Sequence, residues 1–228
     1  MLKKMMALMA GVAGCMGVMS AQAMEGEGGG PAPAGGLVVN ISRSISSIEV
    51  KHGDGMVAVM RNQDTGATID AGFAKTSRKC PPFCAQPMDL GSSVKTLGEV
   101  EVVEFMQTKV ADGSGLLVDA RTPDWHAKGT IPSSINIPYT DVSPQLGADE
   151  AAIEEAMEEF GVTQKGDGWD FSNAKYLVLW CNGPWCGQSP TAIRGLLELG
   201  YPGEKILYYR GGMQMWKMFG LTVVPPAE

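Results

Sequence analysis

This sequence has few histidines and no excess of basic residues. His52 and His126 are the only histidines among 228 residues, which excludes a polyhistidine metal centre and leaves any acid–base step to other groups. Lys and Arg number 18 against 25 Asp and Glu, a formal charge of -7, so no sequence-wide basic surface exists for nucleic acid or anionic lipid. With 44% hydrophobic residues, the chain can still bury a sizeable core.

The sequence also lacks an apolar run long enough for a membrane-spanning helix. The uncharged stretch from Met5 to Met19 is shorter than the ~18 residues that such a helix needs. It follows Lys3 and Lys4 and leads to small residues at 21–23, the pattern of a secretory signal peptide cut after Ala23. We therefore predict a signal peptide at 1–23, no transmembrane span in the mature chain, and a periplasmic or secreted protein.

A second export signal overlaps the first. Val12 to Cys15 resembles the lipobox of bacterial lipoproteins, which would make Cys15 a lipidated amino terminus. This alternative predicts a lipoprotein anchored through Cys15. Residues 24–36 are rich in Gly, Pro, Ala and Glu without an apolar period, which predicts a flexible linker.

Four cysteines follow the export signals: Cys80, Cys84, Cys181 and Cys186. An oxidising compartment permits disulfides, and four thiols allow three complete pairings between which the sequence does not choose. We expect Cys80 and Cys84 to form a structural disulfide, with each other or with another part of the chain. The spacings within the two pairs do not match the gaps of common zinc knuckles, so we predict neither a metal site nor a cofactor.

Beyond the linker, the chain divides into two predicted regions. In residues 37–93, short β-favouring stretches flank a turn signal at His52–Gly55, and the prolines between Lys79 and Pro87 exclude regular helix. We predict a small β-rich N-terminal extension that ends in a Cys/Pro connector. From 94 to 224, strand and helix signals alternate, which predicts an α/β domain with a central parallel sheet flanked by helices.

Local signals predict the elements of this domain. Apolar runs at 116–118, 135–137, 176–180 and 206–209 predict its strands. Thr96, with Glu99 three residues later, forms a capping-box pattern before the apolar residues Val100, Val103 and Met106, which predicts a helix with Thr96 at its N-cap. Ser189, followed by Pro190, is predicted to be the N-cap of another helix.

Cys181 is the candidate for chemistry. It follows the 176–180 strand directly and precedes a tight loop and a helix, the place where open α/β sheets bind ligands. Loop amides and the positive end of the helix dipole favour its thiolate, the nucleophilic form of cysteine. The loop residues that we predict to bind substrate are Asn182, Gly183, Pro184, Trp185, Cys186, Gly187 and Gln188.

Over residues 94–224, the sequence resembles the rhodanese-like sulfurtransferases. The segment from Leu117 to Pro138 is similar to the family's strand-turn-helix stretch, although Thr130 replaces its usual histidine. The segment from Val178 to Cys181, with the loop and helix after it, is similar to the family's cysteine segment. Residues 210–216 are similar to its late Gly-Gly and Trp signature.

The resemblance implies a rhodanese-like fold and a sulfane-sulfur transfer without a cofactor. In that reaction a cysteine thiolate takes sulfur from a donor such as thiosulfate, holds it as a persulfide, and passes it to a thiol or to cyanide. Cys181 matches the reacting cysteine of the family. The resemblance therefore predicts an exported sulfurtransferase with Cys181 as its catalytic residue.

The loop departs from the family pattern. Typical members have an arginine before the serine, whereas the stretch from Cys181 to Ser189 is longer and has no Arg or Lys, with Gln188 near the arginine position. Loss of that cation removes a charge-assisted partner for a small dianion, so we expect a persulfide or a bulkier sulfur donor rather than thiosulfate. Arg121 and Arg210 are candidates to compensate.

Two functions stay open on the sequence alone. In the first, Cys181 turns over sulfur; in the second, a noncatalytic module binds a partner or senses redox state, with Cys181 and Cys186 as a thiol–disulfide switch. Cys186 is a possible resolving thiol, because its attack on a persulfide of Cys181 would release sulfide and leave a disulfide. The sequence identifies no protein partner.

Other candidates have structural interpretations. Asp119 and Arg121 are expected to form an ion pair or hydrogen bonds that support the fold rather than to contact substrate. His126 is expected to be solvated, and Trp216 to lie in the core.

Overall fold

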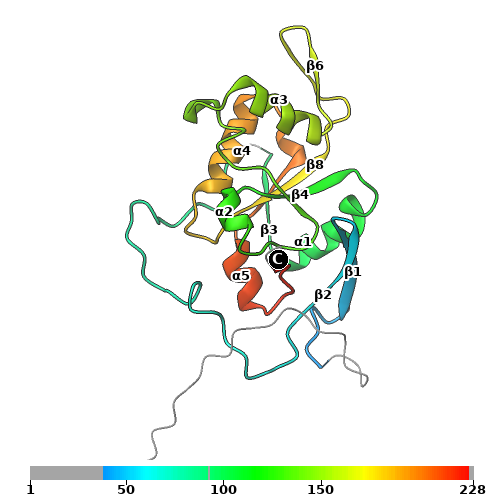
Figure 1. Cartoon of the computed structure of the whole chain (residues 1–228), viewed down its shortest axis with the longest axis vertical. Coiled ribbons are helices and arrows are strands. Elements are labelled where there is room, and N and C mark those ends of the chain that lie inside the picture. The colour runs from blue at the N-terminus through cyan, green and yellow to red at the C-terminus, as the bar shows by residue number, and fades with distance from the viewer. Residues whose placement is uncertain (1–37, 92, 226–228) are drawn as a thin grey trace, which may run out of the picture.

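The computed structural model describes residues 38–91 and 93–225 (Figure 1). The predicted signal peptide at 1–23, the linker at 24–36 and Cys15 lie outside these residues. Within the described part of the chain, no helix has the length and apolar character needed to cross a membrane.

A five-stranded parallel sheet lies at the centre, in the order β3-β9-β8-β4-β5. Its strands are β3 (Lys95–Leu97), β4 (Gly115–Asp119), β5 (Ser134–Asn136), β8 (Tyr176–Trp180) and β9 (Ile206–Tyr209). The predicted α/β class with a central parallel sheet is confirmed. Each of the four predicted strands is present, and the edge strand β3 is an addition that the sequence pattern did not indicate.

Helices cover both faces of this sheet (Figure 1). Val178 and Trp180 of β8 point into one core, and Leu177 and Leu179 point into the other, as alternation along a strand requires. The first core contains α1 (Glu99–Phe105), the π-helical turn η1 (Met106–Val110) and α5 (Gly212–Met218); the second contains α3 (Glu150–Glu159) and α4 (Gln188–Glu198). Because both faces are covered, the inner strands appear in the sequence as continuous apolar runs.

Short elements complete the domain. These are α2 (Pro123–His126), the 3-10 turns η2 (Pro144–Leu146) and η3 (Gly203–Lys205), and the antiparallel pair β6 (Thr163–Lys165) and β7 (Gly168–Asp170). Trp216 of α5 is fully buried, as expected.

The N-terminal extension contributes an antiparallel hairpin. Strands β1 (Ser47–His52) and β2 (Gly55–Met60) pair so that His52 lies opposite Gly55, at the predicted turn. Ile48 and Val50 of β1 enter the core that contains α1 and α5. A bridge between Arg61 and Leu221 joins the end of the hairpin to the last described residues, so the extension packs on the α/β domain.

The first helix does not begin as the capping-box pattern predicted. Thr96 lies in β3, and its hydroxyl donates to the Met88 carbonyl. Helix α1 instead begins at Glu99 after Gly98, whose amide donates to the Glu101 carboxylate at 3.0 Å. Strand pairing with β9 therefore overrides the local capping signal at Thr96.

Candidate active site

Cys181 is fixed by the close approach of α5 to the end of β8. Gly212 has a φ of +54°, and a Cβ atom at this position would overlap the Cys181 carbonyl oxygen, so only glycine permits this approach. The amide of Met213 then donates to the Cys181 carbonyl at 2.9 Å, and that of Gln214 to the Asn182 carbonyl at 3.0 Å. The Gly-Gly segment and the cysteine segment noted in the sequence thus meet directly.

The thiol of Cys181 is enclosed, with only 2% of the residue exposed. The Ser189 hydroxyl donates to its sulfur at 3.0 Å, and its S–H faces the Cys186 carbonyl at 3.3 Å. Burial, together with the adjacent Cys186, raises the pKa of Cys181 well above the ordinary value, despite the hydrogen bond from Ser189. The resting proton of the site therefore stays on Cys181, contrary to the thiolate expected there.

Cys186 is the more acidic of the two free cysteines in the described chain. A hydrogen bond from Cys181, assisted by the amides of Gln188 and Asn182 and the charge of Arg121, lowers the pKa of Cys186 to about 7 despite its burial. The loop amides expected to favour a thiolate thus favour it at Cys186. The surroundings of the pair thus favour ionisation of Cys186 over ionisation of Cys181.

Ser189 differs from its predicted role as an N-cap. Helix α4 begins at Gln188 with Gly187 as its N-cap, and Ser189 is fully buried in the first turn. Its hydroxyl donates to the sulfur of Cys181, and it does not accept a hydrogen bond from a helix amide as an N-cap would. Ser189 is therefore part of the site, a role that its local sequence did not indicate.

Asp119, at the end of β4, organises a buried network beside the loop. Arg121 donates to both of its carboxylate oxygens, at 2.7 and 2.5 Å, and to the Gly129 carbonyl at 2.8 Å. The Thr130 hydroxyl donates to the same carboxylate at 3.0 Å, and the Nδ1 atom of His126 lies 2.9 Å from it. The expected ion pair is present, whereas His126 belongs to this network and is not simply solvated.

This network gives Arg121 an electrostatic role. Burial opposes ionisation of Asp119, but hydrogen bonds from Arg121 and His126 outweigh it and keep the pKa of Asp119 below its ordinary value. The Arg121 guanidinium also lies 4.7 Å from the ring centroid of Trp180. With donors committed to Asp119 and Gly129, Arg121 acts on Cys186 through its charge.

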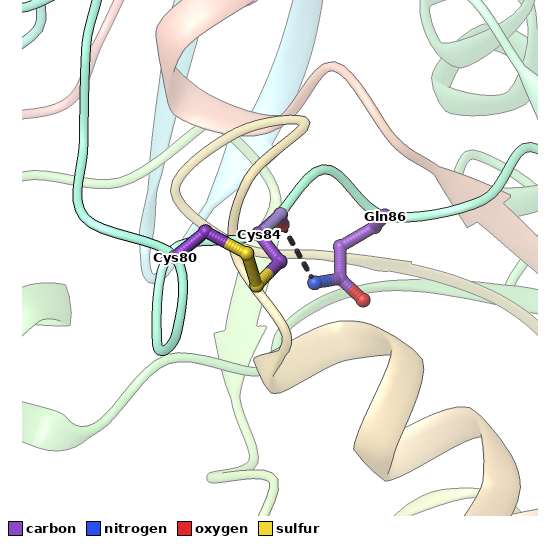
Figure 2. The surroundings of a disulfide bond; sticks show 3 residues. All are labelled: Cys80, Cys84 and Gln86. Carbon is purple, nitrogen blue, oxygen red and sulfur yellow. Dashed lines mark hydrogen bonds between the residues drawn. A yellow bond between two sulfur atoms is a disulfide. The ribbon is translucent and has the colours of Figure 1, made fainter.

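The N-terminal extension covers the outside of the loop. The Gln86 amide donates to the Pro184 carbonyl at 2.8 Å, and the Nε atom of Arg210 donates to the Gln86 carbonyl at 2.8 Å. A disulfide joins Cys80 to Cys84 just before this contact, and the Gln86 side chain donates to the Cys84 carbonyl at 2.9 Å (Figure 2). Arg210, considered above as a binder of an anionic donor, instead fastens the extension to the domain.

Trp185 connects the loop to side chains that sequence reasoning missed. Its indole N–H donates to the Gln214 side chain at 2.7 Å. The Arg78 guanidinium lies 3.8 Å from the centroid of its ring, and the Phe83 ring meets it edge-on at 5.6 Å. No motif marked these residues, because they are brought to the loop only by the path of the extension.

The cysteine loop as a whole is anchored from several sides. Gly183 accepts a hydrogen bond from the Cys186 amide at 2.9 Å, which folds the loop back over Cys181. Among the described residues, no group of three His, Cys, Asp or Glu side chains is placed to hold a metal ion. The arrangement thus offers two adjacent thiols that can exchange a proton and exchange sulfur–sulfur bonds.

We expect Asp119→Asn to lower the free energy of unfolding by about 3–5 kcal/mol, because the buried Arg121 guanidinium loses its counter-charge. Thr130→Val is the matched control, since it removes one hydrogen bond to the same carboxylate and should cost about 1 kcal/mol. Urea denaturation of both variants measures the difference. Equal losses for the two variants would contradict the role assigned to Asp119.

Comparison with known proteins identifies the fold family. The model of the rhodanese-like domain family matches residues 101–219. No curated protein matches this chain.

Several solved structures are similar to part of the chain. A human single-domain sulfurtransferase is 24% identical, covers 56% of this chain and 96% of its own, and has a TM-score of 0.37. A rhodanese-related protein from Thermoplasma volcanium is 22% identical, with 57% and 97% covered and a TM-score of 0.37. An As-Sb reductase from Leishmania major is 20% identical, with 56% and 79% covered and a TM-score of 0.39.

The family match spans more than half of the sequence and includes the cysteine loop, the Asp119 network and the Gly-Gly segment of α5. It agrees with the resemblance noted in the sequence. The chain belongs to the rhodanese-like domain family.

Proposed function

We propose that this protein is a sulfurtransferase that accepts a sulfane sulfur on Cys181 as a persulfide and passes it to a thiol or to cyanide. The observation that carries the proposal is the proximity of two buried thiols after β8, where Cys181 donates to the Cys186 carbonyl at 3.3 Å and accepts from the Ser189 hydroxyl at 3.0 Å. Membership of the rhodanese-like family supports the same reaction class.

Cys186 is assigned as the base that activates Cys181. When Cys181 attacks the outer sulfur of a persulfide donor, its proton passes to the thiolate of the neighbouring Cys186. The sulfur–sulfur bond of the donor breaks, a bond from that outer sulfur to Cys181 forms, and the donor leaves as a thiolate. Charge is conserved, because one thiolate is consumed at Cys186 and one is released.

Ser189 supports Cys181 as the acceptor of sulfur. Its hydroxyl already donates to the Cys181 sulfur at 3.0 Å, so it can stabilise negative charge that develops there as the proton leaves. Cys181 also occupies the position directly after β8, whereas Cys186 lies in the loop. The two cysteines therefore have different proposed roles.

The charged groups near the loop favour an organic persulfide donor over thiosulfate. Arg121 is committed to Asp119, and Arg210 donates to the Gln86 carbonyl. The Gln188 side chain is neutral, and its Oε1 atom lies 3.5 Å from the Cys186 sulfur. A small dianion would thus lack the charge-assisted donors that a loop arginine supplies in other members of the family.

A second candidate function uses the same two thiols without turnover. If Cys186 attacks the inner sulfur of a Cys181 persulfide, sulfide leaves and a disulfide between Cys181 and Cys186 remains. The fold of the loop, which sets the Cys181 thiol against the Cys186 carbonyl at 3.3 Å, favours this alternative, in which the module senses the redox state or the sulfur supply.

Export belongs to the proposal as well. The signal at 1–23 suggests a periplasmic or secreted protein, and the Cys80–Cys84 disulfide is compatible with an oxidising compartment. Mass analysis of the mature amino terminus distinguishes export as a soluble protein from export as a lipoprotein. A start at Met24 indicates the soluble protein, and a lipidated Cys15 indicates the anchored one. A full-length chain that still begins at Met1 would contradict export.

Sulfur loading tests the choice between enzyme and sensor. Incubation of the reduced protein with a persulfide donor should add one sulfur atom to the wild type, as intact mass measures, and none to Cys181→Ser, because that variant lacks the acceptor. Subsequent cyanide should remove the added sulfur as thiocyanate. A wild type that gains no sulfur and forms only the Cys181–Cys186 disulfide would support the sensor and exclude the transferase.

The pH dependence of loading tests the role of Cys186. In the wild type the loading rate should rise with pH and reach half its plateau near the Cys186 pKa of about 7, because only the thiolate can take the proton. In Cys186→Ser the rate at neutral pH should fall about a hundredfold, and the midpoint should move upward, because burial raises the pKa of Cys181. Because both proteins are assayed with the same donor, ionisation of the donor affects both profiles equally. Identical pH profiles for the wild type and Cys186→Ser would refute the assignment of Cys186 as the base.

A further inference from the structure

A hollow lies where the N-terminal extension crosses the cysteine loop. Its volume is about 410 Å³, within the range of about 300–1,000 Å³ typical of small-molecule sites. The residues that matter to its chemistry are Thr76, Ser77, Arg78, Phe83, Trp185 and Gln214. Five residues of the extension and three of the rhodanese-like domain line the hollow, so both parts contribute to it.

Contacts between the two parts hold this hollow in shape. The Gln214 side chain donates to the Phe73 carbonyl at 2.8 Å while it accepts from the Trp185 indole at 2.7 Å. A backbone hydrogen bond from Gln86 to Pro184, which lines the hollow, joins the two parts a second time. Several hydrogen bonds, rather than one flexible side chain, therefore fix the shape of the hollow.

Arg78 supplies the hollow with a cation that is free to bind. Its guanidinium stacks on Trp185, and one terminal nitrogen donates to the Gly72 carbonyl at 3.3 Å. The Nε–H group is buried and has no hydrogen-bond partner among the described residues. A guanidinium carries five N–H donors in a planar fork, so the second terminal nitrogen of Arg78, which has no partner among the described residues and is not fully buried, is left to bind a carboxylate.

The walls also discriminate between classes of anion. Phe83 and Trp185 present apolar ring surface beside the guanidinium, while Thr76 and Ser77 line the same space with hydroxyl groups. An inorganic dianion offers nothing to pack against these rings. An organic molecule with both an apolar or peptide-like part and a carboxylate fits all of these groups.

We propose that this hollow binds the organic portion of a low-molecular-weight persulfide, with a carboxylate of that donor on Arg78. The inference rests on the proposed function and specifies its substrate class: a carboxylate-bearing thiol that carries one extra sulfur. Trp185 belongs both to the hollow and to the loop, directly before Cys186, so a donor held there lies beside the segment that carries the reacting pair. Arg78 thereby replaces, from outside the domain, the cation absent from the loop.

Paired donors test the proposal. Glutathione persulfide carries carboxylates, and its diethyl ester presents the same sulfur chemistry without them. Arg78→Ala should lower kcat/KM for the free acid at least about tenfold, the loss expected for charge-assisted hydrogen bonds, and change the value for the ester less than about twofold. Lys75→Ala is the matched control, because this exposed cation of the same segment does not line the hollow, and it should change neither value. Equal losses with both donors, or no loss with either, would overturn the proposal.

A binding measurement separates this inference from the reaction itself. S-methylglutathione cannot transfer sulfur, and calorimetry should show that it binds the wild type and Cys181→Ser alike, with affinity at least about tenfold weaker for Arg78→Ala. Such binding in a protein that loads no sulfur from any donor would refute the proposed function and support the hollow. Undetectable binding to the wild type, or unchanged binding to Arg78→Ala, would overturn the assignment of the hollow whether or not Cys181 loads sulfur.

Discussion

The proposed chemistry depends on the burial of two neighbouring free thiols, Cys181 and Cys186, after β8. Cys181 keeps the proton because burial disfavours its charge, and Cys186 can release its own because Cys181, two loop amides and Arg121 all stabilise its thiolate. The arrangement depends on the close contact of Gly212 with the Cys181 carbonyl and on the fold of the loop, which brings Cys186 back over the end of β8. A change in either would separate the thiols and remove the reason for the low pKa of Cys186.

The site extends beyond the rhodanese-like domain into the N-terminal extension. Asp119 and Arg121 form a buried ion pair that supports the end of β4 and places a positive charge near Cys186. On the other side, the extension brings a disulfide, an arginine and an aromatic ring against the loop. A rhodanese-like domain without a loop cation is thus combined with a segment that carries one.

Much of the fold could be predicted from the sequence, and the reason is burial. The strands at 176–180 and 206–209 are covered on both faces, so their apolar runs are continuous and mark them without ambiguity. Strand β3 escaped prediction because it has only three residues, one of them an exposed Lys95, and its pairing partner β9 is more than a hundred residues away. The position of Cys181 after a strand followed from the same apolar pattern that predicted β8.

The distribution of charge within the site could not be predicted in the same way. Which cysteine ionises depends on how deeply each is buried and on which amides face it, and neither property is encoded locally. Ser189 has the sequence context of an N-cap, yet its hydroxyl bonds Cys181. Arg78 lies in a segment without a motif and reaches Trp185 only through the path of the folded extension.

The most direct test of the account is to locate the added sulfur after loading and alkylation, by fragmentation of the tryptic peptide that spans residues 176–194. The account predicts that the extra sulfur lies on Cys181. An extra sulfur on Cys186, with Cys181 unmodified, would contradict it.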